Sequence, residues 1–232
     1  MRRSGAARDV ARMARVALLA LGVCSGFAGC TGSLFQSKAA PPAVYMLSAN
    51  LGTAAGAPAV PADLAVLRPR IRSGLETDRV AVLYPDRHLD YLADVRWSGP
   101  LDQVVQDLAL RAFDTGAHLR TVSSDSSAFV SGYWLEIEVT DFQAEYSAAV
   151  SAPTIHVHLL ARVGGSGDRR ILGRFAADAR ETASDNRVSA IVDAYERAAD
   201  AALAQIVAST SRALTDSLEA CRTCANVAPV GR

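Results

Sequence analysis

Two histidines, His156 and His158, have a spacing that could support chemistry. Residues two apart on a β-strand point to the same face of the sheet, so the two imidazoles could share a metal ion. A metal site needs three or four ligands, however, and no cysteine or paired carboxylate lies nearby at a fixed spacing. We therefore interpret the pair as part of a solvated strand face and predict no metal and no cofactor; His88 and His118 are isolated and receive no role.

Cys221 and Cys224 form a Cys-Arg-Thr-Cys motif near the C-terminus, a spacing found in redox proteins. Such a motif works by lowering a thiol pKa at the start of a helix, whereas this one is expected beyond the last helix. In an oxidising compartment the two thiols would form a local disulfide, remain an inert tail or link to a partner. The sequence also lacks a nucleophile elbow, a P-loop and a dinucleotide-binding turn. We predict no catalytic residues and no enzymatic activity.

Cys30 follows the parts of a secretory signal. Arginines are concentrated in residues 1–15, an apolar run occupies Val16–Val23, and Phe27–Gly29 leads into the cysteine. The apolar run is too short to span a membrane, which takes about 20 residues. The segment ending in Cys30 resembles the lipobox of bacterial lipoproteins, whose cysteine is lipidated and becomes the new N-terminus. This resemblance implies that residues 1–29 are a removed signal peptide and that Cys30 carries the lipid.

A lipidated cysteine is a membrane anchor rather than a nucleophile. Each acyl CH₂ buried in a bilayer contributes about 0.8 kcal/mol, so several chains on one residue hold a soluble domain at the membrane. By resemblance to enterobacterial sorting, Thr31 after Cys30 implies the outer membrane, with the protein facing the periplasm of the cell envelope. Residues 30–42 would be a lipidated flexible tether, because Thr31–Pro42 is small, polar and proline-containing.

The remaining chain has the composition of a packed domain. Half of all residues are apolar and 21% are charged, which disfavours disorder. The formal net charge is zero, but the first fifteen residues hold five arginines and one aspartate, so the rest is mildly acidic. An acidic body without a basic stripe lacks the positive charge that phosphate backbones require, and we predict no nucleic-acid partner. We assign residues 43–214 to one domain and residues 215–232 to a disordered C-terminal tail.

The first part of this domain predicts strands, a hairpin and a helix. Residues 44–48 and 64–67 are short β-type runs, and residues 79–84 and 88–97 form a hairpin around Pro85-Asp86-Arg87. Ser98 is the expected N-cap of a helix that has Pro100 in its first turn and its stop at Asp114-Thr115-Gly116. The residues of its apolar face have helical spacing: Leu101, Val104, Val105, Leu108, Ala109 and Ala112.

The second part predicts an antiparallel meander and a long helix. Residues 133–140 and 155–161 alternate apolar and polar side chains, which predicts two strands, and Glu136 and Glu138 are expected on the solvent-exposed face. A glycine-rich turn then leads to a third antiparallel strand at residues 170–177. An alanine-rich apolar stripe from Val188 to Val207 predicts the last helix, packed closely on the sheet. With residues 118–122 as a further short strand, we expect an α/β (α+β) domain with a mixed, largely antiparallel sheet of six or seven strands and two main helices.

Two segments resemble a known family. Asp78–Val82, and then Tyr91–Leu101 with its Arg-Trp-x-x-Pro-Leu stretch, are similar to the ABC-type transport auxiliary lipoprotein family, the small lipoproteins that accompany MCE-type lipid transport systems. The likeness extends over residues 43–212. It implies a periplasmic domain at the outer membrane that docks on an MCE-domain protein and its ABC permease system, without catalysis or ATP binding of its own. A homo-oligomer is compatible with it.

Two other functional classes are compatible with the sequence. One is an envelope assembly lipoprotein, similar in plan to the lipopolysaccharide-assembly lipoprotein or to a TolB-like domain. The other is a periplasmic ligand-binding or redox module that uses Cys221 and Cys224. Neighbouring genes separate the first class from a transport role, and replacement of both cysteines tests the second.

Overall fold

The computed structural model describes residues 41–52 and 59–227, and all of these except Pro41 belong to one unit, Pro42–Arg232. These residues form nine strands and two helices, against the six or seven strands expected, and the predicted mixed α+β fold is confirmed. The strands are β1 (Ala43–Tyr45), β2 (Val60–Val66), β3 (Arg70–Ile71), β4 (Arg79–Leu83), β5 (Leu89–Trp97), β6 (Leu119–Ser124), β7 (Tyr133–Glu145), β8 (Thr154–Gly165) and β9 (Ile171–Thr182). The helices are α2 (Leu101–Gly116) and α3 (Val188–Val227).

Strand β7 is the centre of the sheet. On one side it pairs antiparallel with β8, which pairs antiparallel with β9, and this is the predicted meander. On its other side β7 pairs in turn with the short strands β2, β3 and β4, all parallel to it. Strand β6 extends the sheet beyond β2, while β5 and then β1 extend it beyond β4. The β4–β5 pair is the hairpin expected from the sequence.

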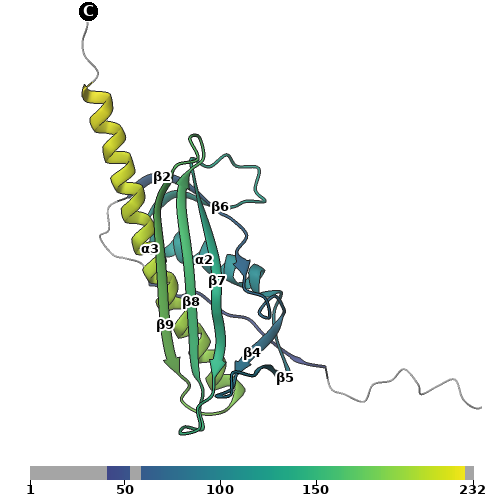
Figure 1. Ribbon diagram of the computed structural model, residues 1–232. Helices are drawn as coiled ribbons and strands as arrows, with labels where there is room; N and C mark the ends of the chain where they lie inside the picture. Colours follow the sequence, from purple (N-terminus) through teal and green to yellow (C-terminus); the bar gives the residue numbers. More distant parts are fainter. Residues whose placement is uncertain (1–40, 53–58, 228–232) are drawn as a thin grey trace, which may run out of the picture. The chain divides into compact units, whose positions relative to one another are not determined.

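Helix α3 packs on β8 and β9, and α2 packs beside it on β6, β2 and β3; Figure 1 shows both helices behind the strands β7, β8 and β9. Odd-numbered residues of β8, from Ile155 to Val163, point into the core that this packing encloses. On α3, small side chains such as Ala194, Ala198 and Ala202 are buried, which lets the helix lie close to the strands as predicted. The other face of β7, β8 and β9 carries polar side chains.

Three aromatic rings fill the centre of the core. Tyr195 of α3 lies 5.0 Å from Trp97 and 5.2 Å from Phe142, measured between ring centroids. Its ring is fully buried, and its hydroxyl donates a hydrogen bond to the Ala81 carbonyl at 3.0 Å. Burial raises the pKa of Tyr195 well above its ordinary value. The residue thus ties the long helix to both hairpin strands and to β7.

Helix α2 buries the predicted stripe, with Phe113 added to it. The expected N-cap is wrong: Pro100 occupies the cap position, and no side chain makes a capping hydrogen bond there. The carbonyl of Thr77 instead accepts from the Leu101 N–H at 3.1 Å. A backbone group from the preceding loop therefore satisfies a donor that a Ser98 hydroxyl was expected to satisfy.

Helix α3 is much longer than its apolar stripe predicts. It continues to Val227, so the expectation of a disordered tail from residue 215 is wrong for residues 215–227; residues 228–232 lie outside the described part of the chain. Forty residues of α-helix measure about 60 Å, and Figure 1 shows the last part of α3 running past the strands it covers. Within residues 41–52 and 59–227, neither helix has an apolar stretch long enough to cross a membrane.

Thr210 of α3 allows a test of how the buried face of this helix is packed. The residue is fully buried, and its hydroxyl makes no hydrogen bond in the described part of the chain. We expect Thr210→Val to raise the free energy of unfolding by about 1 kcal/mol, because it replaces an unsatisfied hydroxyl by a methyl group of the same shape. Urea denaturation measures the change. Thr215→Val is the matched control, since the Thr215 hydroxyl donates to the Ser211 carbonyl at 2.9 Å; equal stabilisation by both variants would contradict the explanation.

Candidate functional site

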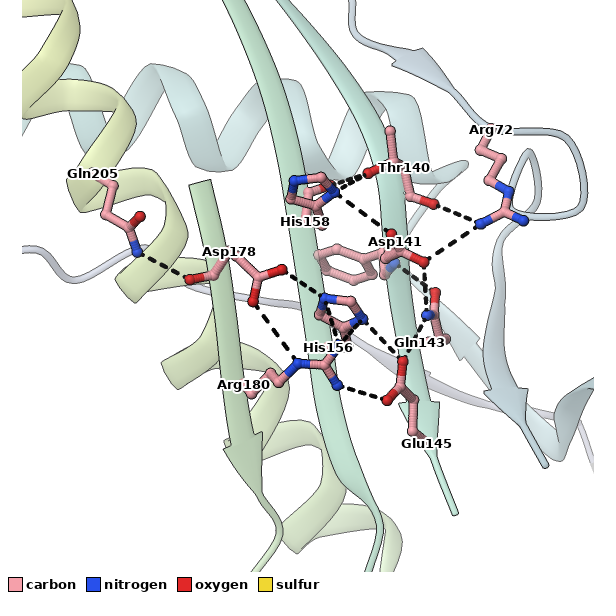
Figure 2. A network of polar contacts seen from close by, with 11 residues as sticks. Arg72, Thr140, Asp141, Gln143, Glu145, His156, His158, Asp178, Arg180 and Gln205 are labelled. Atoms are coloured by element: carbon pink, nitrogen blue, oxygen red, sulfur yellow. Dashed lines mark hydrogen bonds and ion pairs between the residues drawn. The ribbon is translucent and has the colours of Figure 1, made fainter. Parts of the chain in front are cut away.

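The polar face of the meander carries a continuous network of side chains, shown in Figure 2. Strand pairing brings its members together: Gln143 of β7 lies opposite His156 of β8, which lies opposite Arg180 of β9. His158 is paired in the same way with Asp141 and Asp178. These residues share one face because they alternate with the core residues of the same strands.

His156 is the centre of the network. Its Nδ1 lies 2.9 Å from a carboxylate oxygen of Glu145, and its Nε2 lies 3.0 Å from a carboxylate oxygen of Asp178. Arg180 approaches the same Nδ1 to 3.0 Å and donates to the other Glu145 oxygen at 2.8 Å. The imidazole is only 10% exposed, so the prediction of a solvated strand face is wrong for this residue. Both ring nitrogens of His156 therefore have hydrogen-bond partners within the network.

The network continues toward β3. Gln143 donates to carboxylate oxygens of both Glu145 and Asp141, at 3.1 and 3.0 Å. His158 turns away from His156 and makes a 2.7 Å hydrogen bond with the hydroxyl of Thr140. The two imidazoles do share a face, as predicted, but their stacked rings are 6.3 Å apart and have different partners. In the described residues, no three histidine, cysteine, aspartate or glutamate side chains are grouped to hold a metal ion.

A small cavity of about 260 Å³ opens beside the network. Arg72 and Arg180 line it together with Glu145, and Leu83 and Leu89 supply an apolar wall. The guanidinium of Arg72 donates to the Thr140 carbonyl at 3.4 Å. The site therefore offers fixed donors and acceptors in paired arrangements, which hold three strands in register, rather than a reactive group.

Two carboxylates of this network, Glu145 and Asp178, have depressed pKa values. Burial acts to raise the pKa of Glu145, but hydrogen bonds from Arg180, Gln143 and His156 outweigh it and leave that pKa below its ordinary value. The hydrogen bond from His156 lowers the pKa of Asp178, against a smaller opposing effect of burial. A pKa that is lower in the folded than in the unfolded chain means that the unfolded chain binds more protons in acid. The stabilisation is complete above the ordinary carboxyl pKa of about 4 and is lost as the pH falls through the lowered values.

We therefore expect Glu145→Gln combined with Asp178→Asn to weaken the protein at pH 7 and to flatten its acid dependence. The free energy of unfolding of the double variant should fall less between pH 5 and pH 2 than that of the natural protein, because two acid-sensitive contributions are removed. Urea denaturation at a series of pH values measures both effects. Parallel pH curves for the two proteins would show that these carboxylates do not stabilise the fold.

Sequence reasoning missed most of this network. Glu145 and Arg180 lie beyond the predicted ends of their strands, although the alternation Ala177, Asp178, Ala179 and Arg180 is a signal that β9 continues. The sequence-predicted lipid attachment residue, Cys30, lies outside the described residues. Cys221 is an exposed free thiol on α3, so the motif lies within a helix rather than after it; the side chain of Cys224 is not described, and their disulfide stays a prediction.

The fold defines a class of small domain in which two helices cover one face of a mixed sheet. A crystal structure of the Xanthomonas campestris protein XCC0632 has this fold, with a TM-score of 0.69 and 21% identity over 76% of this chain and 99% of that one. A second crystal structure, of an uncharacterized protein, has a TM-score of 0.53 and 16% identity over 75% and 98% of the two chains. No curated protein matches the sequence.

The family is shown by the sequence itself. The profile of the ABC-type transport auxiliary lipoprotein component matches residues 45–207, and the chain belongs to this family. The resemblance noted from the Arg96–Leu101 stretch is thereby confirmed. Membership implies association with an ABC transport system and a place in the cell envelope, and the family is one of transport components rather than enzymes.

Proposed function

We propose that this protein is the outer-membrane lipoprotein of an MCE-type ABC lipid transport system. Signal peptidase removes residues 1–29, acyl chains on Cys30 anchor the chain, and the domain that begins at β1 docks on the MCE assembly from the periplasm. The observation that carries the proposal is the family match over residues 45–207, which includes eight of the nine strands in full and half of α3.

The distance between anchor and domain supports a docking role. Twelve residues, 31–42, separate Cys30 from the first residue of β1. A chain of twelve residues spans at most about 40 Å when extended. The domain is thus kept near the membrane surface, where an assembly that bridges the envelope would meet it.

The segment that follows β1 is held against the folded body. It buries a continuous core from Leu47 to Leu214, and the Ser48 and Asn50 N–H groups are held by Glu196 and Asp200 of α3. The segment that leads from the tether is therefore fixed to the longest helix.

Genetic epistasis tests the proposal. Deleting this gene and deleting the permease gene of the MCE-type system in the same genome should give the same sensitivity to bile salts or detergent. The double deletion should be no more severe, because both products act in one lipid path. An additive double phenotype would instead place the protein in a separate pathway, as for an envelope assembly factor.

A further inference from the structure

A groove lies between the beginning of β9 and the last part of α3. It encloses about 530 Å³, which is within the range of about 300–1,000 Å³ for sites that bind small molecules. Its floor is apolar, formed by Ile171, Leu172 and Phe175 of the strand and by Ala213 of the helix. Ile171 is 39% exposed, so a large apolar side chain faces the open groove. The groove is distinct from the polar network, which lies on the other face of the meander.

A glycine shapes this floor. The ring of Phe175 lies over Gly173, and a Cβ at that position would be 2.4 Å from the Cζ atom of the ring. The absence of a side chain at Gly173 therefore lets the ring lie flat along the strand. Leu214 and Leu218 of α3 continue the apolar core toward the same end of the molecule. The helix and the Phe175 ring thus border a groove whose floor is apolar.

Positively charged side chains lie at the rim of the groove. Arg170 and Arg212 both line it, and neither guanidinium makes a hydrogen bond or ion pair with any residue in the described ranges. Asp216 is the one carboxylate among the lining residues and likewise has no partner there. The rim has two guanidiniums for a phosphate and one carboxylate for an ammonium group, with a net charge of +1.

A peptide strand is a poorer occupant than a lipid. Strand β9 is at the edge of the sheet, paired only with β8. Beside the groove, however, its register shifts between Gly173 and Ile171, which leaves Leu172 as an extra residue in a bulge. Bulges interrupt the ladder that an added strand would need and are a common protection of sheet edges. Farther along, Gln205 reaches the Asp178 carbonyl at 3.2 Å and occupies that part of the edge.

We infer that this groove binds a phospholipid, with an acyl chain on the Phe175 floor and the headgroup phosphate on Arg170 and Arg212. The inference deepens the proposed function, on which it rests, by giving the domain direct contact with the transported class of molecule. Guanidiniums bind phosphate through paired, charge-assisted hydrogen bonds. Asp216 adds a site for the ammonium of an aminated headgroup such as phosphatidylethanolamine.

Photocrosslinking in cells tests the inference on the full chain. A benzophenone amino acid replaces Ser217, which lines the groove, in a strain whose phospholipids are labelled with ³²P-phosphate. The lipid anchor on a lipoprotein contains no phosphorus, so label on the protein after irradiation reports a second, crosslinked lipid. The matched control places the same amino acid at Ala176, which is exposed on the same strand. We expect label at position 217 and only background at position 176.

Charge variants then test the headgroup contact. Arg170→Gln with Arg212→Gln should reduce the label at position 217 about tenfold, as expected for the loss of charge-assisted phosphate contacts. Arg174→Gln is the control, because Arg174 does not line the groove but lines a separate cavity with Leu160 and Arg162, and the substitution should leave the label unchanged. Release of the label by phospholipase C identifies a phospholipid.

The outcomes separate this inference from the proposed function. Absence of label at position 217 while the permease and MCE protein still co-purify would overturn the lipid site and leave the transport role intact. A crosslinked product that carries a protein instead of phosphorus would also overturn it, in favour of a peptide partner. Label at position 217 without co-purification of any transport protein would support the lipid site and contradict the transport role.

Discussion

Tyr195→Ala is expected to lower the free energy of unfolding by about 3–5 kcal/mol, the cost typical of removing a buried aromatic side chain. The ring is fully buried between Trp97 and Phe142, so its loss leaves a cavity that neither neighbour can fill without moving a strand. The hydroxyl is a smaller part of the effect. Its hydrogen bond to the Ala81 carbonyl accounts for about 1 kcal/mol, which is the expected cost of Tyr195→Phe.

Urea denaturation followed by tryptophan fluorescence measures both variants, because the Trp97 ring lies against Tyr195. The natural protein and Tyr195→Phe should show a similar denaturant dependence and differ mainly in midpoint. If Tyr195→Ala costs no more than Tyr195→Phe, the helix is not held by the aromatic cluster. The position of α3 on the sheet would then need another explanation.

Cys30→Ala is expected to transfer the protein from the membrane fraction to the soluble fraction almost completely. Each buried CH₂ of an acyl chain contributes about 0.8 kcal/mol to membrane binding, and removal of the sulfur removes the site on which the chains are assembled. Fractionation of cells by ultracentrifugation, followed by immunoblotting, measures the distribution. Cys24→Ala is the control, since Cys24 precedes the proposed cleavage point and should leave the protein in the membrane.

A membrane-bound Cys30→Ala protein of the mature size would contradict lipid anchoring at this residue. An unprocessed protein held by its signal peptide is a different outcome, recognised by its larger mass. The substitution should not affect the fold, because Leu47 is the first residue of the described core and Cys30 precedes it.

Parts of the fold follow from local pattern alone. Helix α2 has an apolar stripe at helical spacing and a clear stop, so its limits differ from the prediction by few residues. Strands β7 and β8 alternate so regularly over Leu135–Val139 and Ile155–Ala161 that the meander could be predicted. The Arg96–Leu101 stretch is specific enough to indicate the family by its residues alone.

Other features depend on register, which a single sequence does not specify. Thr140 forms a bulge in β7, and the apolar core positions change from odd to even after it, from Val139 to Phe142 and Ala144. A strand predicted from alternation alone therefore ends too early and does not include Gln143 and Glu145. Because the network around His156 combines three strands, an error in one strand end hides the whole arrangement.

The end of α3 is hard to predict for a different reason. After Leu214 the sequence has only one more leucine before Cys221, so the apolar stripe fades and suggests a tail. Yet no glycine or proline occurs from Val188 to Val227, and Pro229 is the first residue that disfavours a helix. The helix continues on intrinsic propensity beyond the sheet, and this extension forms one wall of the groove proposed to bind lipid.

Co-purification of the tagged full chain from mild detergent extracts tests the central claim most directly. We predict recovery of an MCE-domain protein together with the permease and ATPase of its ABC system. The control is a fusion of residues 1–42 to an unrelated folded domain, which shares the anchor and should recover none of them. Equal recovery by this fusion, or no transport component with the full chain, would contradict the assignment of the folded domain as a docking component.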